Sequence, residues 1–188
     1  MTATITTITT TTPLATGTWT IDPSHSTVGF VVRHLGFSKV RGGFGAFEGT
    51  IEVADDLTAS TATVTIQADS FDSGDEGRDE HVRSGDFLEV EAHPTLTFVA
   101  TDVKHVSGSD YVVTGDLTIK GITQQVELTT EYLGTDTDPF GNTKAGFEAT
   151  TEIDREDFGL TWNAALESGG VLVGKKVQIV LEVQATKA

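Results

Sequence analysis

Apolar residues alternate with polar ones along most of this 188-residue chain, and this period of two constrains the fold more than any other feature. The alternating runs lie at residues 28–34, 62–66, 111–119, 122–128 and 177–183, with further ones at 47–53, 96–106 and 147–153. Side chains of a β-strand point alternately to its two faces, so each run predicts a strand with one buried face. The sequence therefore predicts an all-β protein of about eight strands.

Short turn signals separate the alternating runs. They are Asp55-Asp56, Ser107-Gly108-Ser109, Lys120-Gly121 and the segment 139–142. Gly and Asn tolerate positive φ and Asp closes turns locally, and several gaps have hairpin length. Neighbouring strands should therefore pair as antiparallel, which favours an up-and-down barrel without exposed edges over the alternative, a two-sheet sandwich.

Three segments depart from the strand pattern. Residues 1–16 are a Thr-rich stretch without large apolar residues, which predicts a disordered tail before one barrel domain at residues 17–188. Residues 75–91 predict a short helix near residues 78–84 that covers one mouth of the barrel. Residues 154–170, rich in glycine, predict a loop or a short helix.

The charge balance excludes several partners. The formal net charge is −16, with 28 Asp and Glu against 12 Lys and Arg. Nucleic-acid binding needs a basic surface, and so does electrostatic docking on an anionic membrane, so the charge argues against both. The apolar runs are too short to span a bilayer, and the N-terminus lacks the features of a signal peptide, so we expect a cytoplasmic protein.

Three partial motifs do not amount to catalytic sites. Residues 169–176 resemble a phosphate-binding loop, but they end in Lys176 and run into a predicted strand. Residues 136–141 resemble the start of a calcium loop, but the turn of a hairpin explains them better. Asp22, Ser24 and His25 are the residue types of a hydrolase triad, but we expect their closeness in sequence to prevent the required arrangement. We predict no catalytic residues and, since the chain has no cysteine, no thiolate site.

Histidine and arginine side chains mark one mouth of the predicted barrel. Arg33 precedes His34 at the end of a strand, and Arg78 lies near His81 in the predicted helix. If the 31–37 segment and the helix share a mouth, these groups form a local positive site for a phosphate or quinone headgroup. Two alternatives remain open: the arginines pair with nearby acids, or the histidines bind a metal ion, as in a metalloprotein or an enzyme.

The size of the inward-facing residues bears on what the barrel contains. Eight strands enclose an interior that side chains fill or that holds one small ligand. Several inward positions are small or of medium size, among them Val28, Ala62 and Ala149. This favours a cavity, although a flattened, packed barrel without a ligand is also consistent with the pattern.

Four sequence blocks resemble those of the YceI-like family. They are Trp19-Thr20-Ile21-Asp22-Pro23-Ser24-His25-Ser26 with Gly42-Gly43-Phe44, residues 78–88 with Pro94 and Phe98, residues 115–123, and residues 153–160. They occur in order and cover residues 18–187. The resemblance implies an extended, lipocalin-like antiparallel barrel that binds, carries or stores a polyisoprenoid lipid and is not an enzyme. It implies no cofactor other than the lipid.

The candidate site combines the resemblance with the strand pattern. We expect the lipid tail to contact the inward residues Phe30, Val32, Val64, Val99, Val113, Leu117 and Val126. We expect the headgroup to lie at the mouth formed by Arg33, His34, Arg78 and His81. The sequence leaves open whether the protein is a monomer or a homodimer.

Overall fold

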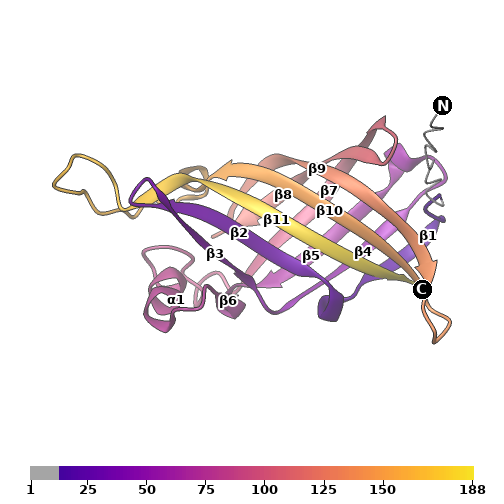
Figure 1. The fold of residues 1–188 in the computed structure, drawn as a ribbon, viewed down its shortest axis with the longest axis horizontal. Coiled ribbons are helices and arrows are strands. Elements are labelled where there is room, and N and C mark those ends of the chain that lie inside the picture. The colour runs from indigo at the N-terminus through magenta and orange to yellow at the C-terminus, as the bar shows by residue number, and fades with distance from the viewer. Residues whose placement is uncertain (1–12) are drawn as a thin grey trace, which may run out of the picture.

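The computed structural model describes residues 13–188 and is a closed, eight-stranded antiparallel barrel with a short helix at one end (Figure 1). The strands are β1 (Gly17–Ile21), β2 (Thr27–His34), β3 (Ser38–Phe44), β4 (Phe47–Val53), β5 (Thr61–Gln67), β6 (Phe71–Asp72), β7 (Thr95–Ser107), β8 (Asp110–Ile119), β9 (Ile122–Thr137), β10 (Thr143–Asp154) and β11 (Val173–Lys187). The ring runs β1-β4-β5-β7-β8-β9-β10-β11 and closes where β1 pairs with β11. The all-β, antiparallel barrel prediction is confirmed.

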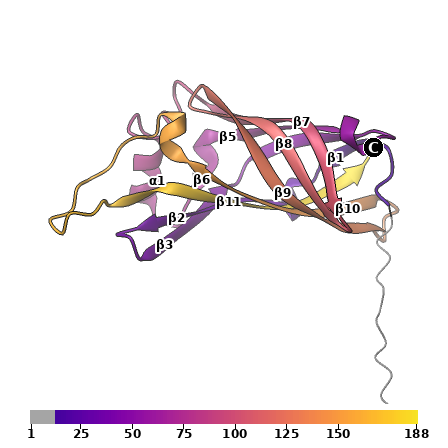
Figure 2. The same ribbon diagram turned by 90° about the horizontal axis from the view of Figure 1, so that it is seen from above.

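The long strand β11 has two neighbours on the same edge. Its end, at Ala185 to Lys187, pairs with β1, whereas its first two thirds, from Val173 to Glu182, pair with β2. Strands β3 and β6 continue the sheet beyond β2, so one wall of the barrel extends past the ring (Figure 2). The result is a barrel elongated along its axis, with the extended wall at one end.

A tight turn between β1 and β2 allows both strands to pair with the same edge of β11. The 3-10 turn η1 (Pro23–His25) begins after Asp22, whose carboxylate accepts hydrogen bonds from the Ser24 backbone N–H and hydroxyl. The carboxylate also contacts His25 Nδ1 at 3.0 Å and Lys144 Nζ at 3.3 Å. These hydrogen bonds, that of the Ser24 hydroxyl first and that of His25 next, lower the pKa of Asp22 well below its usual range. Asp22 therefore stabilises this corner as an anion.

The helix α1 (Glu76–Arg83) lies beside β6 at the extended end, as the sequence predicts, and begins two residues earlier than expected. Asp75 caps it by accepting from the Arg78 N–H at 2.9 Å. Asp79 is buried and accepts hydrogen bonds from the Ser73 backbone and hydroxyl. Burial raises the pKa of Asp79, but the hydrogen bonds from Ser73 and the charge of Arg83 outweigh it, so the net pKa is lowered.

The remaining irregular regions agree in part with the sequence. Residues 155–158 form a 3-10 turn, η4 (Arg155–Phe158), and a long loop follows before β11. Of the predicted tail, residues 1–12 lie outside the described residues. In the described part, Leu14 packs against a buried cluster at the barrel end, and the Trp19 indole donates to the Ala15 carbonyl at 2.9 Å.

Two separate buried clusters fill the barrel. One lies at the end with the termini and consists of Trp19, Val53, Tyr132, Ala145 and Ala185, with Phe147 packed on it. The larger one includes aromatic residues from β2, β4, β6 and the segment after α1, and it surrounds an internal space. The barrel is thus filled at one end and hollow toward the other.

Candidate functional site

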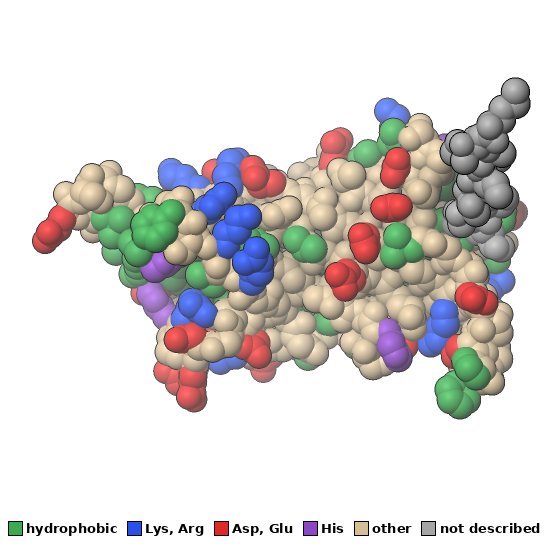
Figure 3. All heavy atoms as spheres, viewed as in Figure 1, with side chains coloured by type: hydrophobic (Ala, Val, Ile, Leu, Met, Phe, Trp, Pro, Cys, Tyr) green, Lys and Arg blue, Asp and Glu red, His purple; other side chains and the backbone are tan. Residues whose placement is uncertain are grey.

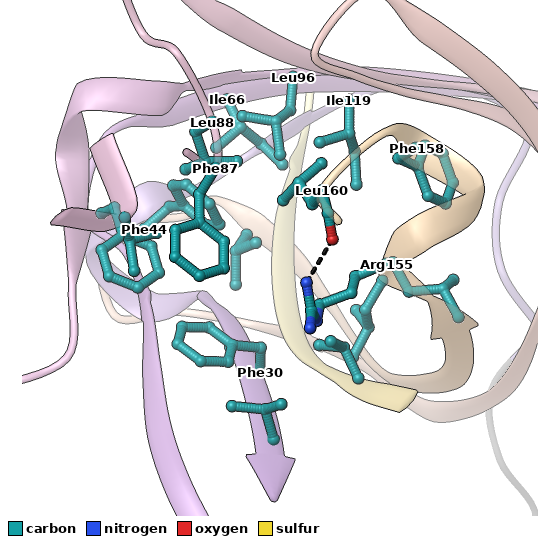
Figure 4. A pocket seen from close by; sticks show the side chains of 18 of the residues that line it. Phe30, Phe44, Ile66, Phe87, Leu88, Leu96, Ile119, Arg155, Phe158 and Leu160 are labelled. Carbon is teal, nitrogen blue, oxygen red and sulfur yellow. Dashed lines mark hydrogen bonds between the residues drawn. The ribbon is translucent and has the colours of Figure 1, made fainter. Parts of the chain in front are cut away.

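The hollow part of the barrel is a cavity of about 510 Å³. Its wall is almost wholly apolar, and Figure 4 shows Phe30, Phe44 and Phe87 beside it, with Arg155 facing the same space. The inward faces of β2, β5, β8, β9 and β11 build the wall, and α1 with the segment behind it closes one side. This cavity contradicts the packed interior that the sequence left as an alternative.

Nine of the eleven residues predicted for the site line this cavity. They are Phe30, Val32, Arg33, His34, Val64, Arg78, His81, Leu117 and Val126. Apart from Arg33, which lies between Val32 and His34 on the outer face of β2, the strand residues among them share one face because the backbone alternates. The structure therefore brings together the predicted tail-contacting residues and the predicted mouth residues around one space.

The interior position predicted for Val99 is wrong. The Val99 side chain is 41% exposed, whereas its neighbours Phe98 and Leu96 line the cavity. The strand β7 begins at Thr95 with Leu96 inward, so the odd-numbered Val99 points out. Val113 is half-buried opposite Leu128 and is not among the lining residues, so it does not contribute to the cavity wall as predicted.

The predicted arginines at the mouth are bound to their own loops rather than to acids. Arg33 Nη1 donates to the Phe37 carbonyl at 3.2 Å, and Arg78 donates to the Ser73 hydroxyl at 2.6 Å and to its carbonyl at 2.8 Å. Within residues 13–188 neither forms an ion pair. Direct pairing with carboxylates, the alternative that the sequence left open, is therefore not found at Arg33 or Arg78, although the charge of Arg78 acts on Asp79.

Arg155, which the sequence did not indicate as a site residue, is the most deeply buried cation on the cavity wall. Only 4% of it is exposed, and Nε donates to the Gly174 carbonyl at 2.9 Å. Nη1 donates to the Leu160 carbonyl and Nη2 to that of Val173 at 3.4 Å (Figure 4). Burial lowers the pKa of Arg155, and the charges of Glu156 and Asp154 partly offset this. Local pattern gave no signal for this role, because Arg155 lies in the η4 turn and its partners are the carbonyls of residues 160, 173 and 174.

An aromatic cluster lies near Arg155 at the same mouth. His81 packs edge-on against Trp162 with ring centroids 4.5 Å apart, and against Phe87 at 5.2 Å. The Arg155 guanidinium lies 5.9 Å from the centre of the Phe87 ring. His81 Nε2 is 2.8 Å from an Asp86 carboxylate oxygen, which fixes the ring orientation. The mouth thus combines flat aromatic surfaces with a buried cation.

The metal alternative gains no support from the geometry. In the part of the chain that the structure describes, no group of three or more His, Cys, Asp or Glu side chains lies close enough to hold a metal ion. His34 and His81 both line the cavity, as the sequence suggested, but no third potential ligand joins them.

The three triad-type residues do meet, contrary to expectation, because the η1 turn folds them together. The Ser24 hydroxyl lies 3.0 Å from His25 Nδ1 and 2.6 Å from the Asp22 carboxylate. Asp22 contacts the same nitrogen, His25 Nδ1. A catalytic relay needs the serine and the acid on opposite nitrogens of the histidine. This cluster therefore serves as a cap for the turn.

No helix within residues 13–188 has both the length and the apolar character needed to cross a membrane.

Comparisons with known proteins agree with this architecture. A family model described as a YceI-like domain matches residues 19–185. A UPF0312 protein of Staphylococcus aureus is 39% identical over 162 residues, covering 85% of this chain and 92% of the relative. The crystal structure of BcnA from Burkholderia cenocepacia superposes with a TM-score of 0.77 at 24% identity, covering 87% of this chain and 98% of that one.

A further structure is described as a polyisoprenoid binding domain from Saccharophagus degradans implicated in plant cell wall breakdown. It superposes with a TM-score of 0.67 at 15% identity and covers 90% of this chain and 98% of that one. Likeness at these low identities shows a shared fold.

Proposed function

The chain belongs to the YceI-like family, and from this membership and the shape of its cavity we propose that it binds a polyisoprenoid or isoprenoid-quinone lipid for carriage or storage. The observation that carries the proposal is the cavity of about 510 Å³ with an almost wholly apolar wall. The polyisoprenoid-binding neighbour of the same fold supports the choice of lipid.

The wall chemistry suits the tail of such a lipid. An isoprenoid chain is long and has no polar atoms, and burying it contributes about 25 cal/mol per Å² of apolar surface. Binding of this kind needs no catalytic group, so the function that we propose is not that of an enzyme.

The polar groups at the mouth suit a headgroup that accepts hydrogen bonds. A guanidinium has five N–H donors, and Arg155 uses three on backbone carbonyls, which leaves two without an acceptor among residues 13–188. A quinone or phosphate oxygen would accept from them. The rings of His81, Phe87 and Trp162 offer faces and edges for a flat headgroup.

The proposed cargo implies that the protein holds a lipid away from water after it leaves a membrane. Carriage and storage differ only in how long the complex lasts, and the same cavity serves both. The cytoplasmic location that the N-terminal sequence predicts stays a prediction.

Native mass spectrometry with organic extraction tests the proposal. The freshly purified protein, or protein exposed to an isoprenoid quinone in detergent, should carry an added mass that denaturation releases. Val32→Asp places a charge on the cavity wall and should abolish loading, because a buried unpaired carboxylate opposes apolar filling.

Val31→Asp is the matched control. Val31 alternates with the lining residues Phe30 and Val32 and pairs with Arg41 on the outer face, so this variant should load normally. A protein that stays bare after exposure to the quinone, or a Val32→Asp variant that loads like wild type, would refute lipid binding in this cavity.

A further inference from the structure

The basic residues are concentrated on one part of this acidic protein. Five of the twelve Lys and Arg residues are exposed on β2, β3 and β11 at the extended end. These residues, the basic strip, are Arg33, Lys39, Arg41, Lys175 and Lys176. Figure 3 shows Lys and Arg gathered at this end beside hydrophobic side chains, while Asp and Glu predominate over the middle of the barrel. The net charge of −16 therefore hides a local positive surface.

Most of the charge on the basic strip is free to act outward. Lys175 is paired with Glu156 at 2.7 Å, and Lys176 is 3.9 Å from Asp154. No carboxylate within residues 13–188 lies within ion-pair distance of the other three members, Arg33, Lys39 and Arg41. The cross-strand register places Arg33 directly opposite Lys39, so two positive charges share one face of the sheet. Like charges in this position are unfavourable without an external anion.

Exposed apolar side chains accompany the basic strip. Phe37 is 73% exposed at the tip of the β2–β3 hairpin, and Val171 is 47% exposed in the loop before β11. Leu35 and Gly36 have positive φ and form the tight turn that holds Phe37 outward. The Leu35 N–H donates to the Leu172 carbonyl at 2.9 Å, so the two apolar tips belong to adjoining segments.

One member of the basic strip, Arg33, and residues next to the apolar tips line the cavity itself. Arg33, His34 and Val40 line it from the hairpin, and Leu172 and Val173 line it from the adjoining loop. Apolar groups flanked by cations are the combination that binds the surface of an anionic bilayer, where the cations meet headgroups and the apolar groups enter the interface. We propose that this end docks on an anionic lipid bilayer, which, if the proposed function holds, places the cavity entrance where the lipid cargo leaves the membrane.

Vesicle sedimentation with two matched double variants tests the docking. Phe37→Ser/Lys39→Glu alters the proposed surface, and Phe140→Ser/Lys104→Glu makes the same chemical changes at exposed residues of the opposite end. Wild type should bind vesicles of equal parts phosphatidylcholine and phosphatidylglycerol but not phosphatidylcholine alone. Vesicle binding should weaken strongly when the salt concentration rises from about 0.1 M to about 1 M, since the Debye length shortens from ~10 Å to ~3 Å. The Phe37→Ser/Lys39→Glu variant should bind the mixed vesicles at least about tenfold more weakly than wild type. The Phe140→Ser/Lys104→Glu control should bind them like wild type.

Quinone uptake from detergent, measured on the same proteins, separates this proposal from the proposed function. Uptake with no binding to anionic vesicles would overturn the docking and leave lipid binding intact. Vesicle binding that depends on Phe37 and Lys39, without any uptake, would sustain the docking and refute the cargo. Equal binding by both variants, or retention on heparin without vesicle binding, would assign the basic strip to something other than a membrane and overturn the proposal.

Discussion

The two ends of the barrel share one set of strands but differ in what fills them. At the end with the termini, Trp19 is 1% exposed and packs with Tyr132 and Ala185, and the strand ring closes around them. Toward the extended end, the inward side chains are aliphatic and aromatic groups that line a wall, and a cavity remains between them. The packed cluster at the filled end stabilises the ring of strands. The residues at the hollow end can therefore differ in size and chemistry to suit the proposed ligand.

This division places the packed cluster and the cavity wall, the proposed binding site, on different residues of one continuous sheet. A side chain at the filled end contacts other side chains on all sides, so truncation leaves a void. A side chain at the hollow end already borders empty space, so its loss removes fewer contacts and mainly changes the ligand's surroundings. The four predictions that follow test this difference, from the largest effect to the smallest.

Truncation at the filled end should cost the most stability. Trp19→Ala should lower the free energy of unfolding by about 3–5 kcal/mol, because the side chain is fully buried and its indole N–H bonds to the Ala15 carbonyl. Urea denaturation followed by circular dichroism measures this. The fraction that stays folded should still take up the quinone, and loss of uptake in folded protein would show that the two ends are not independent.

Truncation at the hollow end should cost less. Phe30 is half-buried and stacks on Phe71 with ring centroids 5.3 Å apart, so Phe30→Ala should lower the unfolding free energy by about 1–3 kcal/mol. The same denaturation curves provide the number, and quinone affinity should fall in parallel. A stability loss as large as that of Trp19→Ala would contradict the proposed division.

Removing the buried cation should change selectivity. Arg155→Met should weaken binding of an isoprenoid quinone by about tenfold and leave binding of squalene, which has no headgroup, within about twofold. Arg83→Met is the control, since Arg83 donates to the Phe71 carbonyl and does not line the cavity. Competition binding in detergent measures both ligands, and equal losses for quinone and squalene would assign Arg155 a purely structural role.

The smallest effect should come from the corner that joins β1 to β2. Asp22 has a lowered pKa, so its contribution is present above the unfolded carboxyl pKa of about 4 and is lost as the pH falls through the lower folded value. Asp22→Asn should therefore cost about 1–2 kcal/mol at pH near 7, and the difference from wild type should shrink at pH below about 4. Unfolding curves across this range test it, and a difference that grows on acidification would contradict stabilisation by the hydrogen-bonded Asp22 anion.

The sequence predicted the fold well because the alternation of side chains reports directly on which face is buried. It placed Phe30, Val32, Leu117 and Val126 on the inner face, and the helix near 78–84, from local pattern alone. The pattern assigned Val99 to the wrong face. The inward positions of this strand begin at Leu96, and a shift of one residue along a strand moves a side chain to the other face.

Other features depend on contacts between distant segments. Arg155 acquires its role from carbonyls of residues 160, 173 and 174, which no local pattern reveals. The pairing of β1 and β2 with the same edge of β11 also joins residues more than a hundred positions apart. The arrangement of charge on the surface likewise depends on which strands become neighbours, so net charge alone gave an incomplete view of the basic strip.

The seam between β1 and β11 has a consequence for how the molecule is made. The ring cannot close until β11 has been synthesised, so the nascent chain must hold β1 and β10 with unpaired edges until then. Unpaired edges invite pairing with other chains, and contacts between distant residues form slowly. The seam that completes the barrel is therefore also the step before which the folding chain is most open to aggregation.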